Sequence, residues 1–346
     1  MPEHRAEGVQ GFTARRGFLK VLGGSAALAL LSGCFDEFRA LGFKPTVEKH
    51  TPFITPNDDF YLVAVDPAYR PAFQLQDIGQ HWSLELQGRS GATGHIGYDD
   101  LNARARHTVL YTFECIGNPV GGPLIGNARW RVVPLKEMLA RAPGGIGTAR
   151  SVMFEALDGF YSSVSIERAL DDYAFLALQM NGTPLPPGHG FPVRAILPDL
   201  YGMKQPRWLK RIRLLEESAT TSYWEKRGWA GEVPVKTMSR FDPRRHAKAT
   251  QPLALTGVAF GGRRGIRSVE VSLDDGANWI PCQLVTGTQP GVWSLWRYVW
   301  NTPVPGRHSL RVRATDTTGA LQIARYQDSF PDGASGYDQL VLDLSA

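Results

Sequence analysis

The chain has 346 residues, of which 43% are hydrophobic, and its net charge is +5 at pH 7. These values predict a globular protein of about two domains with a well-formed core. The positive charge permits anionic partners, but no basic stripe alternates with aromatic residues, so we predict no nucleic-acid binding. The one local basic cluster is more typical of a solvated linker: Arg240, Arg244, Arg245, His246 and Lys248.

The N-terminal stretch "ARRGFLKVLGGSAALALLSGC" is typical of an export signal. Arg15 and Arg16 form a twin-arginine head, and the apolar run after them is too short to span a bilayer. The run ends in Leu31-Ser32-Gly33-Cys34, which resembles a bacterial lipoprotein box, although cleavage elsewhere would remove Cys34. We therefore predict a signal peptide over residues 1–34 and a periplasmic or exported protein that is lipid-anchored through Cys34.

The twin-arginine route carries proteins that are already folded. A protein needs this route when its core closes around a cofactor that is available only in the cytoplasm. Fast folding without any cofactor is the alternative reason for its use.

Residues 50–235 are predicted to form a first domain of short strands with few helices. "HWSLELQG" alternates in polarity like a half-buried strand, and "HTVLYTF" predicts a strand that leads to Cys115. "SVMFEALD" and "FPVRAILPD" predict two more strands. "PLKEMLARA" predicts a helix, because Leu135, Met138 and Leu139 fall on one face after Pro134.

Residues 250–346 are predicted to form a second domain, a β-sandwich with regularly spaced strands. In "SVEVSL", Val269, Val271 and Leu273 alternate with polar residues, and Asp275-Gly276 is a hairpin-turn signal. Trp296, Tyr298 and Trp300 share one face of a strand, where core packing or an interface is expected rather than substrate stacking.

Cys115 stands between an apolar run and a glycine-rich loop, in "FECIGNPVGGPLIGNARW". A disulfide with Cys282 is not expected, because the two cysteines fall in separate predicted domains. A nucleophile needs a base, but His81, His95, His107 and His189 occupy no hydrolase signature. Zinc needs several ligands, and neither CxxC nor HExxH is present. A single thiolate instead suits a metal whose other ligands are sulfurs of an organic dithiolene.

"FECIGN" and "GNARWRVVPLKEML" resemble the segment that supplies the molybdenum ligand in the sulfite oxidase family of molybdopterin enzymes. Residues 154–216 resemble the same family almost continuously, and "TPNDDFY" resembles its domain start. The resemblance implies an α+β fold, with a sulfite-oxidase-type molybdopterin-binding domain followed by an immunoglobulin-like β-sandwich that mediates dimerisation. The cofactor that it implies is Mo-molybdopterin.

The resemblance also implies roles for individual residues. Cys115 would be the molybdenum ligand and the catalytic residue. The cofactor would be bound by Tyr61, Asp158, His189, Arg194, Lys204, Gln205 and Arg207. Arg207 stands where the family usually has lysine, so the charge is kept. Singly, several of these residues have simpler interpretations, such as Asp158 forming a turn before Gly159 or Arg194 lying on the surface.

Departures from the family pattern concern the substrate. Val63 and Val65 stand where sulfite oxidases have an arginine and a cofactor-binding histidine, and Pro119 and Val120 stand at further arginine positions. A pocket without these charges would desolvate sulfite at high cost, unless Arg70, Arg129 and Arg131 compensate. A neutral sulfoxide is as plausible. The family's methionine-sulfoxide reductase branch also lacks these arginines, but it has Asn at the position of His189 and lacks the sandwich.

The activity that the resemblance implies is oxygen-atom transfer on a small sulfur- or nitrogen-containing substrate. No CxxCH haem signature is present, so a separate cytochrome or membrane quinone-linked protein would exchange the electrons. The alternative is a non-catalytic exported lipoprotein that keeps the fold as a binding or scaffold module.

Overall fold

The computed structural model describes residues 50–346 apart from 66–67, 73, 245 and 287–288. The predicted signal peptide over residues 1–34, with Cys34, lies outside the described residues. Within the described ranges, no helix is long and apolar enough to cross a membrane.

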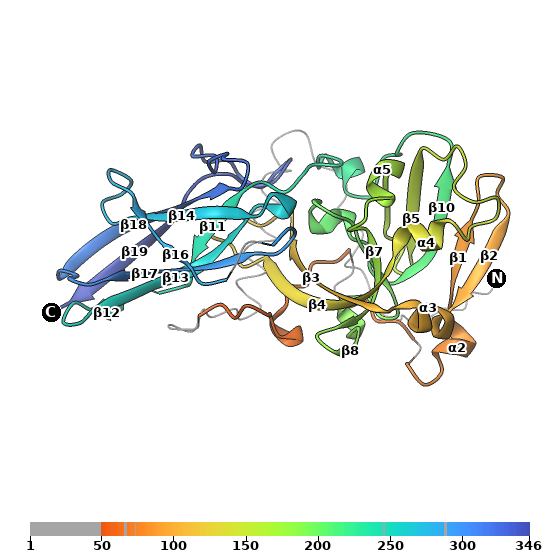
Figure 1. The fold of residues 1–346 in the computed structure, drawn as a ribbon, viewed down its shortest axis with the longest axis horizontal. Helices are drawn as coiled ribbons and strands as arrows, with labels where there is room; N and C mark the ends of the chain where they lie inside the picture. Colours follow the sequence, from red (N-terminus) through yellow and green to blue (C-terminus); the bar gives the residue numbers. More distant parts are fainter. Residues whose placement is uncertain (1–49, 66–67, 73, 245, 287–288) are drawn as a thin grey trace, which may run out of the picture. The chain divides into compact units, whose positions relative to one another are not determined.

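Two β-sheets form the first domain (Figure 1). The first has the order β2-β1-β10-β5-β6, in which β1 is parallel to β10 and the other neighbours are antiparallel. Its strands are β1 (Ser83–Gln87), β2 (Thr93–Gly97), β5 (Ser151–Ala156), β6 (Tyr161–Ser165) and β10 (Leu209–Leu215). The second has the order β3-β4-β7-β8, and β9 pairs with β7. Its strands are β3 (His107–Glu114), β4 (Ile125–Pro134), β7 (Phe175–Met180), β8 (Thr183–Pro184) and β9 (Arg194–Ile196).

The helices in the described residues are all short, so sheets dominate and the predicted α+β class holds only in this coarse sense. The α-helices are α2 (Ile78–His81), α3 (Tyr98–Arg104), α4 (Leu135–Leu139) and α5 (Ile166–Ala169). The 3₁₀ turns are η1 (Asn57–Asp59), η2 (Pro187–His189), η3 (Gly202–Lys204), η4 (Glu225–Arg227) and η5 (Gly262–Arg264).

Local patterns explain several of these elements. The strand predicted in "HWSLELQG" is β1, in which Leu84 and Leu86 are buried and alternate with more exposed residues. The predicted helix is α4, and Leu135, Met138 and Leu139 are all fully buried. Pro134 is the N-cap residue of α4. Proline is favourable there, because it has no backbone N–H and the first N–H groups of a helix have no intrahelical acceptor.

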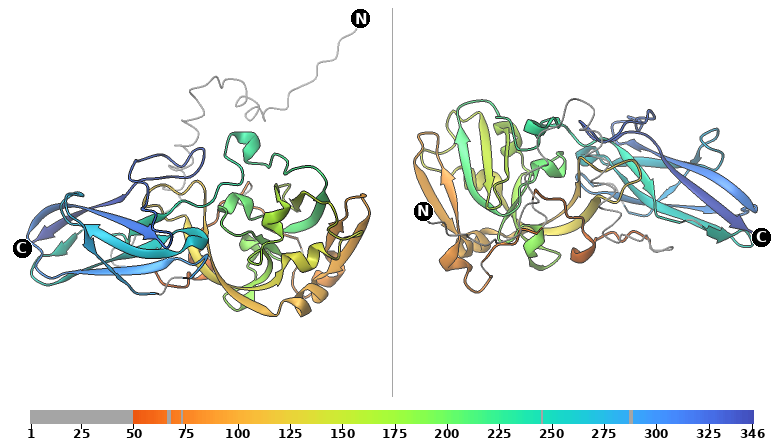
Figure 2. Two further views of the ribbon diagram at one scale, coloured as in Figure 1. Left: turned by 45° about the horizontal axis from the view of Figure 1, so that its top comes forward. Right: turned by 180° about the vertical axis from the view of Figure 1, so that it is seen from behind.

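The second domain, coloured from teal to blue in Figure 2, consists of two sheets that share one core. Their strand orders are β11-β13-β17-β16 and β12-β19-β18-β14-β15. The first comprises β11 (Met238–Phe241), β13 (Leu253–Phe260), β16 (Gln283–Leu284) and β17 (Ser294–Trp300). The second comprises β12 (His246–Lys248), β14 (Ile266–Ser272), β15 (Ile280–Pro281), β18 (Gly306–Asp316) and β19 (Asp338–Ser345). Trp296 and Trp300 lie in this core, as predicted. The immunoglobulin-like character stays a prediction.

The sandwich sheets begin earlier than residue 250, because β11 and β12 already belong to them. The interpretation of Arg240 as part of a solvated linker was therefore wrong. Arg240 lies in β11, is 8% exposed, and donates from Nη1 to the Phe241 carbonyl and from Nη2 to Thr51 Oγ1. Pairing of β11 with β13 carries the Arg240 side chain into the interior, which the local charge pattern could not indicate.

A third apolar core joins the two domains within the unit Val47–Ala346. Ile116 and Tyr201 of the first domain pack there with Phe260 and Trp293 of the second. The backbone N–H of Thr112 also donates to Gly291 at 2.8 Å, so strand β3 is fixed against the second domain. The loop that follows β3 is consequently held from both domains.

Candidate active site

Cys115 follows strand β3 directly and begins the loop that leads to β4. Its backbone N–H donates to the Leu124 carbonyl at 2.9 Å, which closes the loop. Asn118 stabilises the same loop, since its Oδ1 accepts from the Leu124 N–H at 2.9 Å and its Nδ2 donates to Glu114 Oε1 at 3.0 Å. The Cys115 side chain is therefore presented from a fixed backbone.

The Cys115 thiol is free and lies in a buried environment. Burial raises the pKa of this thiol to about 11, and the neighbouring Glu114 raises it further. The sulfur is therefore protonated at neutral pH and a poor nucleophile, whereas a bound metal cation would deprotonate it. Among the described residues, no histidine is hydrogen-bonded to Cys115, which argues against the hydrolase alternative.

Tyr61 lies beside Cys115. A β-carbon at Gly202 would lie 2.8 Å from the Tyr61 hydroxyl and 3.8 Å from the Cys115 Cα. The Tyr61 ring stacks on Phe60 at 5.5 Å between centroids. Burial, and secondarily Cys115, raises the pKa of Tyr61 well above its ordinary value of 10, so its hydroxyl is a neutral hydrogen-bond donor.

Two buried guanidinium groups belong to the same site. Arg194, at the start of β9, is 6% exposed, and its charged carbon lies 4.2 Å from the Phe113 ring centroid. Its Nη1 donates to the His189 carbonyl at 3.2 Å, while its buried Nε has no partner. Burial lowers the pKa of Arg194 to about 9, and Arg207 lowers it further. In the described part of the chain, no carboxylate forms an ion pair with Arg194.

Arg207 is fixed by backbone oxygens. It donates from Nη1 to Gly188 at 2.8 Å and from Nη2 to Val63 at 2.6 Å, and its guanidinium lies over the Trp208 ring. Burial lowers the pKa of Arg207 to about 10, whereas Asp158 acts in the opposite direction. Two positive charges held close together in a low dielectric favour an anionic partner.

His189 ends η2 and is 5% exposed. Its Nε2 lies 2.8 Å from the Asn57 carbonyl, which can only accept, so Nε2 carries the ring proton and Nδ1 is left as an acceptor. Burial lowers the pKa of His189 to about 4, and Arg194 and Arg207 lower it further, so the ring is neutral at pH 7.

The side chains of Lys204 and Gln205 both bind to other groups of the chain. The buried Lys204 ammonium donates to the Ser163 carbonyl at 2.7 Å and to Ser222 Oγ at 2.9 Å, and pairs with Glu225. The Gln205 Nε2 donates to the carbonyls of Leu197 and Leu200. Both side chains hold the segment that carries Gly202 and Arg207, and their direct contact with a cofactor stays a prediction.

Asp158 forms a turn, because its Oδ1 accepts from the Phe160 N–H at 3.0 Å. This contact agrees with the simpler interpretation of Asp158, a residue that forms a turn before Gly159. Its effect on the pKa of Arg207 nevertheless keeps it in the electrostatic surroundings of the site.

Three arginines were considered as replacements for the arginines that sulfite oxidases place around the substrate. Two of them do not provide a charge at the site. Arg129 is exposed. Arg131 donates to Ala105 O at 2.6 Å and to Asn102 Oδ1 and O at 3.1 and 3.0 Å, so its guanidinium is committed to the end of α3. Arg70 does approach the site, since its Nη2 would lie 3.5 Å from a β-carbon at Gly188.

Reasoning from the sequence missed two residues beside Cys115, Glu114 and Trp229. Burial raises the pKa of Glu114 to about 7, and its Oε2 has no hydrogen-bond partner. The spacing of Glu114 and Asn118 was the one available signal for the carboxyl. Trp229 reaches the Cys115 loop from more than a hundred residues away, which no local pattern reveals.

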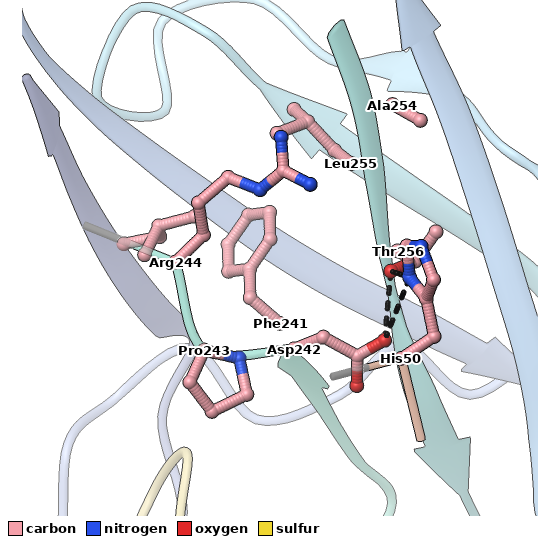
Figure 3. A pocket seen from close by; sticks show the side chains of 9 residues that line it. His50, Phe241, Asp242, Pro243, Arg244, Ala254, Leu255 and Thr256 are labelled. Atoms are coloured by element: carbon pink, nitrogen blue, oxygen red, sulfur yellow. Dashed lines mark hydrogen bonds and ion pairs between the residues drawn. The ribbon is translucent and has the colours of Figure 1, made fainter. Parts of the chain in front are cut away.

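Figure 3 shows a hollow in the second domain from close by, and none of the residues of the Cys115 site lines it. It is lined by His50, Phe241, Asp242, Pro243, Arg244, Ala254, Leu255, Thr256 and Leu340. The Asp242 carboxylate accepts from the Thr51 N–H at 3.2 Å and from Thr256 Oγ1 at 2.7 Å, and His50 Nδ1 lies 2.9 Å from Thr256 Oγ1. Since these polar groups satisfy one another, we assign no chemistry to the hollow.

Residues 71–224 match the family model of the oxidoreductase molybdopterin binding domain. The matched range contains Cys115, His189, Arg194 and Arg207. The cofactor that this domain implies is Mo-molybdopterin, as predicted.

Known relatives of the molybdopterin-binding domain include sulfite oxidases and nitrate reductases. The chain is 29% identical over 321 residues to sulfite oxidase of Gallus gallus, covering 78% of this chain and 68% of that protein. It is 30% identical over 306 residues to mitochondrial sulfite oxidase of Rattus norvegicus, covering 72% of this chain and 54% of that protein. Inducible nitrate reductase [NADH] 1 of Glycine max is 26% identical over 339 residues, covering 80% of this chain and 36% of that protein. The chain thus spans about half the length of the rat protein.

A solved structure shows a similar fold. The sulfane dehydrogenase SoxCD from Paracoccus pantotrophus superimposes with a TM-score of 0.72 at 20% sequence identity, covering 96% of this chain and 93% of that one. The identity is low, so this likeness concerns the fold alone.

The residues of the molybdopterin-binding domain fit an anionic, metal-bearing cofactor. The Cys115 thiol is a soft donor that is not in a disulfide, and the orphaned Nε of Arg194 is a buried cationic donor without an acceptor. His189 Nδ1 adds a neutral acceptor. A cofactor with sulfur-bound metal, phosphate and amine groups would satisfy all three.

Proposed function

We propose that the chain is a molybdenum-dependent oxidoreductase that transfers an oxygen atom to or from a small sulfur- or nitrogen-containing substrate. The observation that carries the proposal is the arrangement of the Cys115 thiol beside Tyr61, with the buried, carboxylate-free guanidinium of Arg194 near Arg207. A buried cation without a counter-charge is costly, and a site that holds one beside a second guanidinium favours an anion.

Each residue of the chain has a distinct part in this proposal. Cys115 holds the metal, and Arg194 and Arg207 balance the negative charge of the cofactor. His189 Nδ1 accepts a hydrogen bond from it. When bound, Mo-molybdopterin supplies two-electron oxygen-atom transfer. Tyr61 stays neutral and donates a hydrogen bond next to the sulfur, while Lys204 and Gln205 keep the segment of Gly202 in place.

Electron supply and location belong to the same proposal. A separate one-electron carrier, such as a cytochrome or a membrane quinone-linked protein, would exchange the electrons, and the second domain would mediate a homodimer. Residues 1–34 would direct export to the periplasm, with a lipid on Cys34. Fractionation of the producing cells and mass spectrometry of the mature N-terminus test the location directly.

Metal analysis with matched cysteine variants tests the proposed function. Wild-type protein produced with cofactor supply should hold about one molybdenum per chain. Cys115→Ser should lose activity yet keep the wild-type circular dichroism spectrum, whereas Cys282→Ser, a change at the other free cysteine among the described residues, should keep both. Folded wild-type protein without molybdenum would support the non-catalytic binding module instead.

A further inference from the structure

An aromatic ring from a distant segment and the sulfur of Cys115 both lie close to Gly117. A β-carbon at Gly117 would lie 3.7 Å from Cys115 Sγ and 3.9 Å from Cη2 of Trp229. The tip of the indole and the thiol therefore border the same small space, which the glycine leaves open. At the level of whole residues, Cys115 and Gly117 are only partly buried.

Trp229 is held in place by the connection between β18 and β19. The Phe330 ring packs edge-on against it, with centroids 5.2 Å apart and planes at 78°. The next residue, Ala230, donates its N–H to the Pro331 carbonyl at 2.9 Å. Since the indole is fixed by both a ring contact and a backbone bond, it forms a rigid apolar wall rather than a mobile side chain.

The charged groups nearest to this wall along the chain are engaged elsewhere. Arg227 donates to the Tyr223 carbonyl at 2.8 Å and lies over that ring, and Lys236 pairs with Asp332 at 3.1 Å. Val120 packs toward Gly336, since a β-carbon added at this glycine would lie 3.4 Å from Val120 Cγ2. The wall thus offers apolar surface and no cation to an incoming substrate.

We infer that Trp229, supported by Phe330, is a specificity-determining residue that selects a neutral oxide of sulfur or nitrogen carrying a flat apolar group. The inference rests on the proposed function, because it places the substrate beside Cys115. A flat group gains stacking energy on the indole, whereas an oxyanion would gain no counter-charge from this apolar wall.

Equilibrium binding to the molybdenum-loaded full chain tests the inference without requiring turnover. The probes are methyl phenyl sulfoxide, dimethyl sulfoxide and sulfite, titrated in ligand-observed NMR. Wild type should bind methyl phenyl sulfoxide about tenfold more tightly than dimethyl sulfoxide. Trp229→Ala should reduce that preference to about twofold or less, and Trp229→Phe should keep most of it.

Two further variants keep the test sharp. Gly117→Ala fills the space without a contact closer than 3.7 Å, so it should fold normally and weaken methyl phenyl sulfoxide binding even if Trp229→Ala does not fold. Trp279→Ala removes an indole that packs on Tyr337 and Arg313 in the second domain, and it should change nothing. An unchanged preference in Trp229→Ala and Gly117→Ala, or sulfite binding more tightly than methyl phenyl sulfoxide in wild type, would overturn the inference.

A turnover assay separates this inference from the proposed function. In the assayed reaction, methyl phenyl sulfoxide accepts two electrons and two protons to give methyl phenyl sulfide and water, and two molecules of reduced methyl viologen each lose one electron. Binding that depends on Trp229, without turnover of any oxide or of sulfite, would support the inference while contradicting the proposed activity. Turnover together with binding that is unchanged in Trp229→Ala would support the proposed activity while contradicting the inference.

Discussion

Gly202 approaches Tyr61 so closely that a β-carbon at this position would lie 2.8 Å from the phenol oxygen. Gly202→Ala should push Tyr61 away from Cys115 and reduce molybdenum retention by about tenfold, the usual scale for a residue that positions a metal ligand. Metal analysis after dialysis measures the effect. Gly97→Ala is the matched control, since a β-carbon there has no neighbour within 4 Å. Equal retention in both variants would rule out this role of Gly202.

Arg194 is expected to contribute to cofactor binding and to lower the unfolding free energy of the cofactor-free chain. Arg194→Met removes a buried charge that has no carboxylate partner, so the cofactor-free chain should gain about 1–3 kcal/mol of unfolding free energy. The same variant should fail to retain molybdenum. Denaturant unfolding and metal analysis measure the two effects. Arg129→Met, at an exposed position of strand β4 in the same sheet, should alter neither. A destabilised Arg194→Met chain would show that the guanidinium is structural.

His189 and Glu114 should oppose each other in the pH dependence of stability. Burial lowers the pKa of His189 from 6.5 to about 4, so the unfolded chain binds more protons in that window and the His189 contribution rises with pH. Burial raises the pKa of Glu114 from 4.5 to about 7, so the folded chain binds more protons there and the Glu114 contribution falls as pH rises. Each contribution amounts to roughly 3 kcal/mol.

Single variants should expose the two slopes in the cofactor-free chain. Between pH 4.5 and 6.5 the wild-type unfolding free energy should be nearly flat. In His189→Gln it should fall with rising pH, because Glu114 is left alone, and in Glu114→Gln it should rise. Denaturant curves at half-unit pH steps measure this, and parallel profiles for the two variants would contradict the assignment.

The pair of Lys204 and Glu225 should be a major source of stability. Lys204→Met leaves Glu225 without its cation in a buried position, which should cost about 3–5 kcal/mol. The double variant Lys204→Met, Glu225→Leu should recover most of that loss. Lys136→Met breaks the exposed pair with Asp172 and should leave the unfolding midpoint unchanged. Equal effects of Lys204→Met and Lys136→Met would contradict a buried pair.

The sequence predicted those parts of the fold that depend on neighbouring residues. Helix α4 and strand β1 follow from the spacing of apolar residues over a few positions. Asp275 and Gly276 both adopt positive φ angles, 59° and 99°, as the turn signal indicated. By contrast, Arg240 looked like a linker residue but is buried, because its environment depends on the pairing of β11 with β13.

The sequence by itself determined which chemical groups are available: one thiol before a glycine-rich loop, and histidine, arginine and tyrosine in an order that a known family shares. Only the tertiary structure decided what these groups experience. It brought Trp229 to the loop of Cys115, committed Arg131 to α3, engaged Lys204 with Glu225, and left Arg194 buried without a counter-charge. The physical reason is that a side chain's identity is local, whereas its pKa, desolvation and partners depend on groups that are distant in the chain.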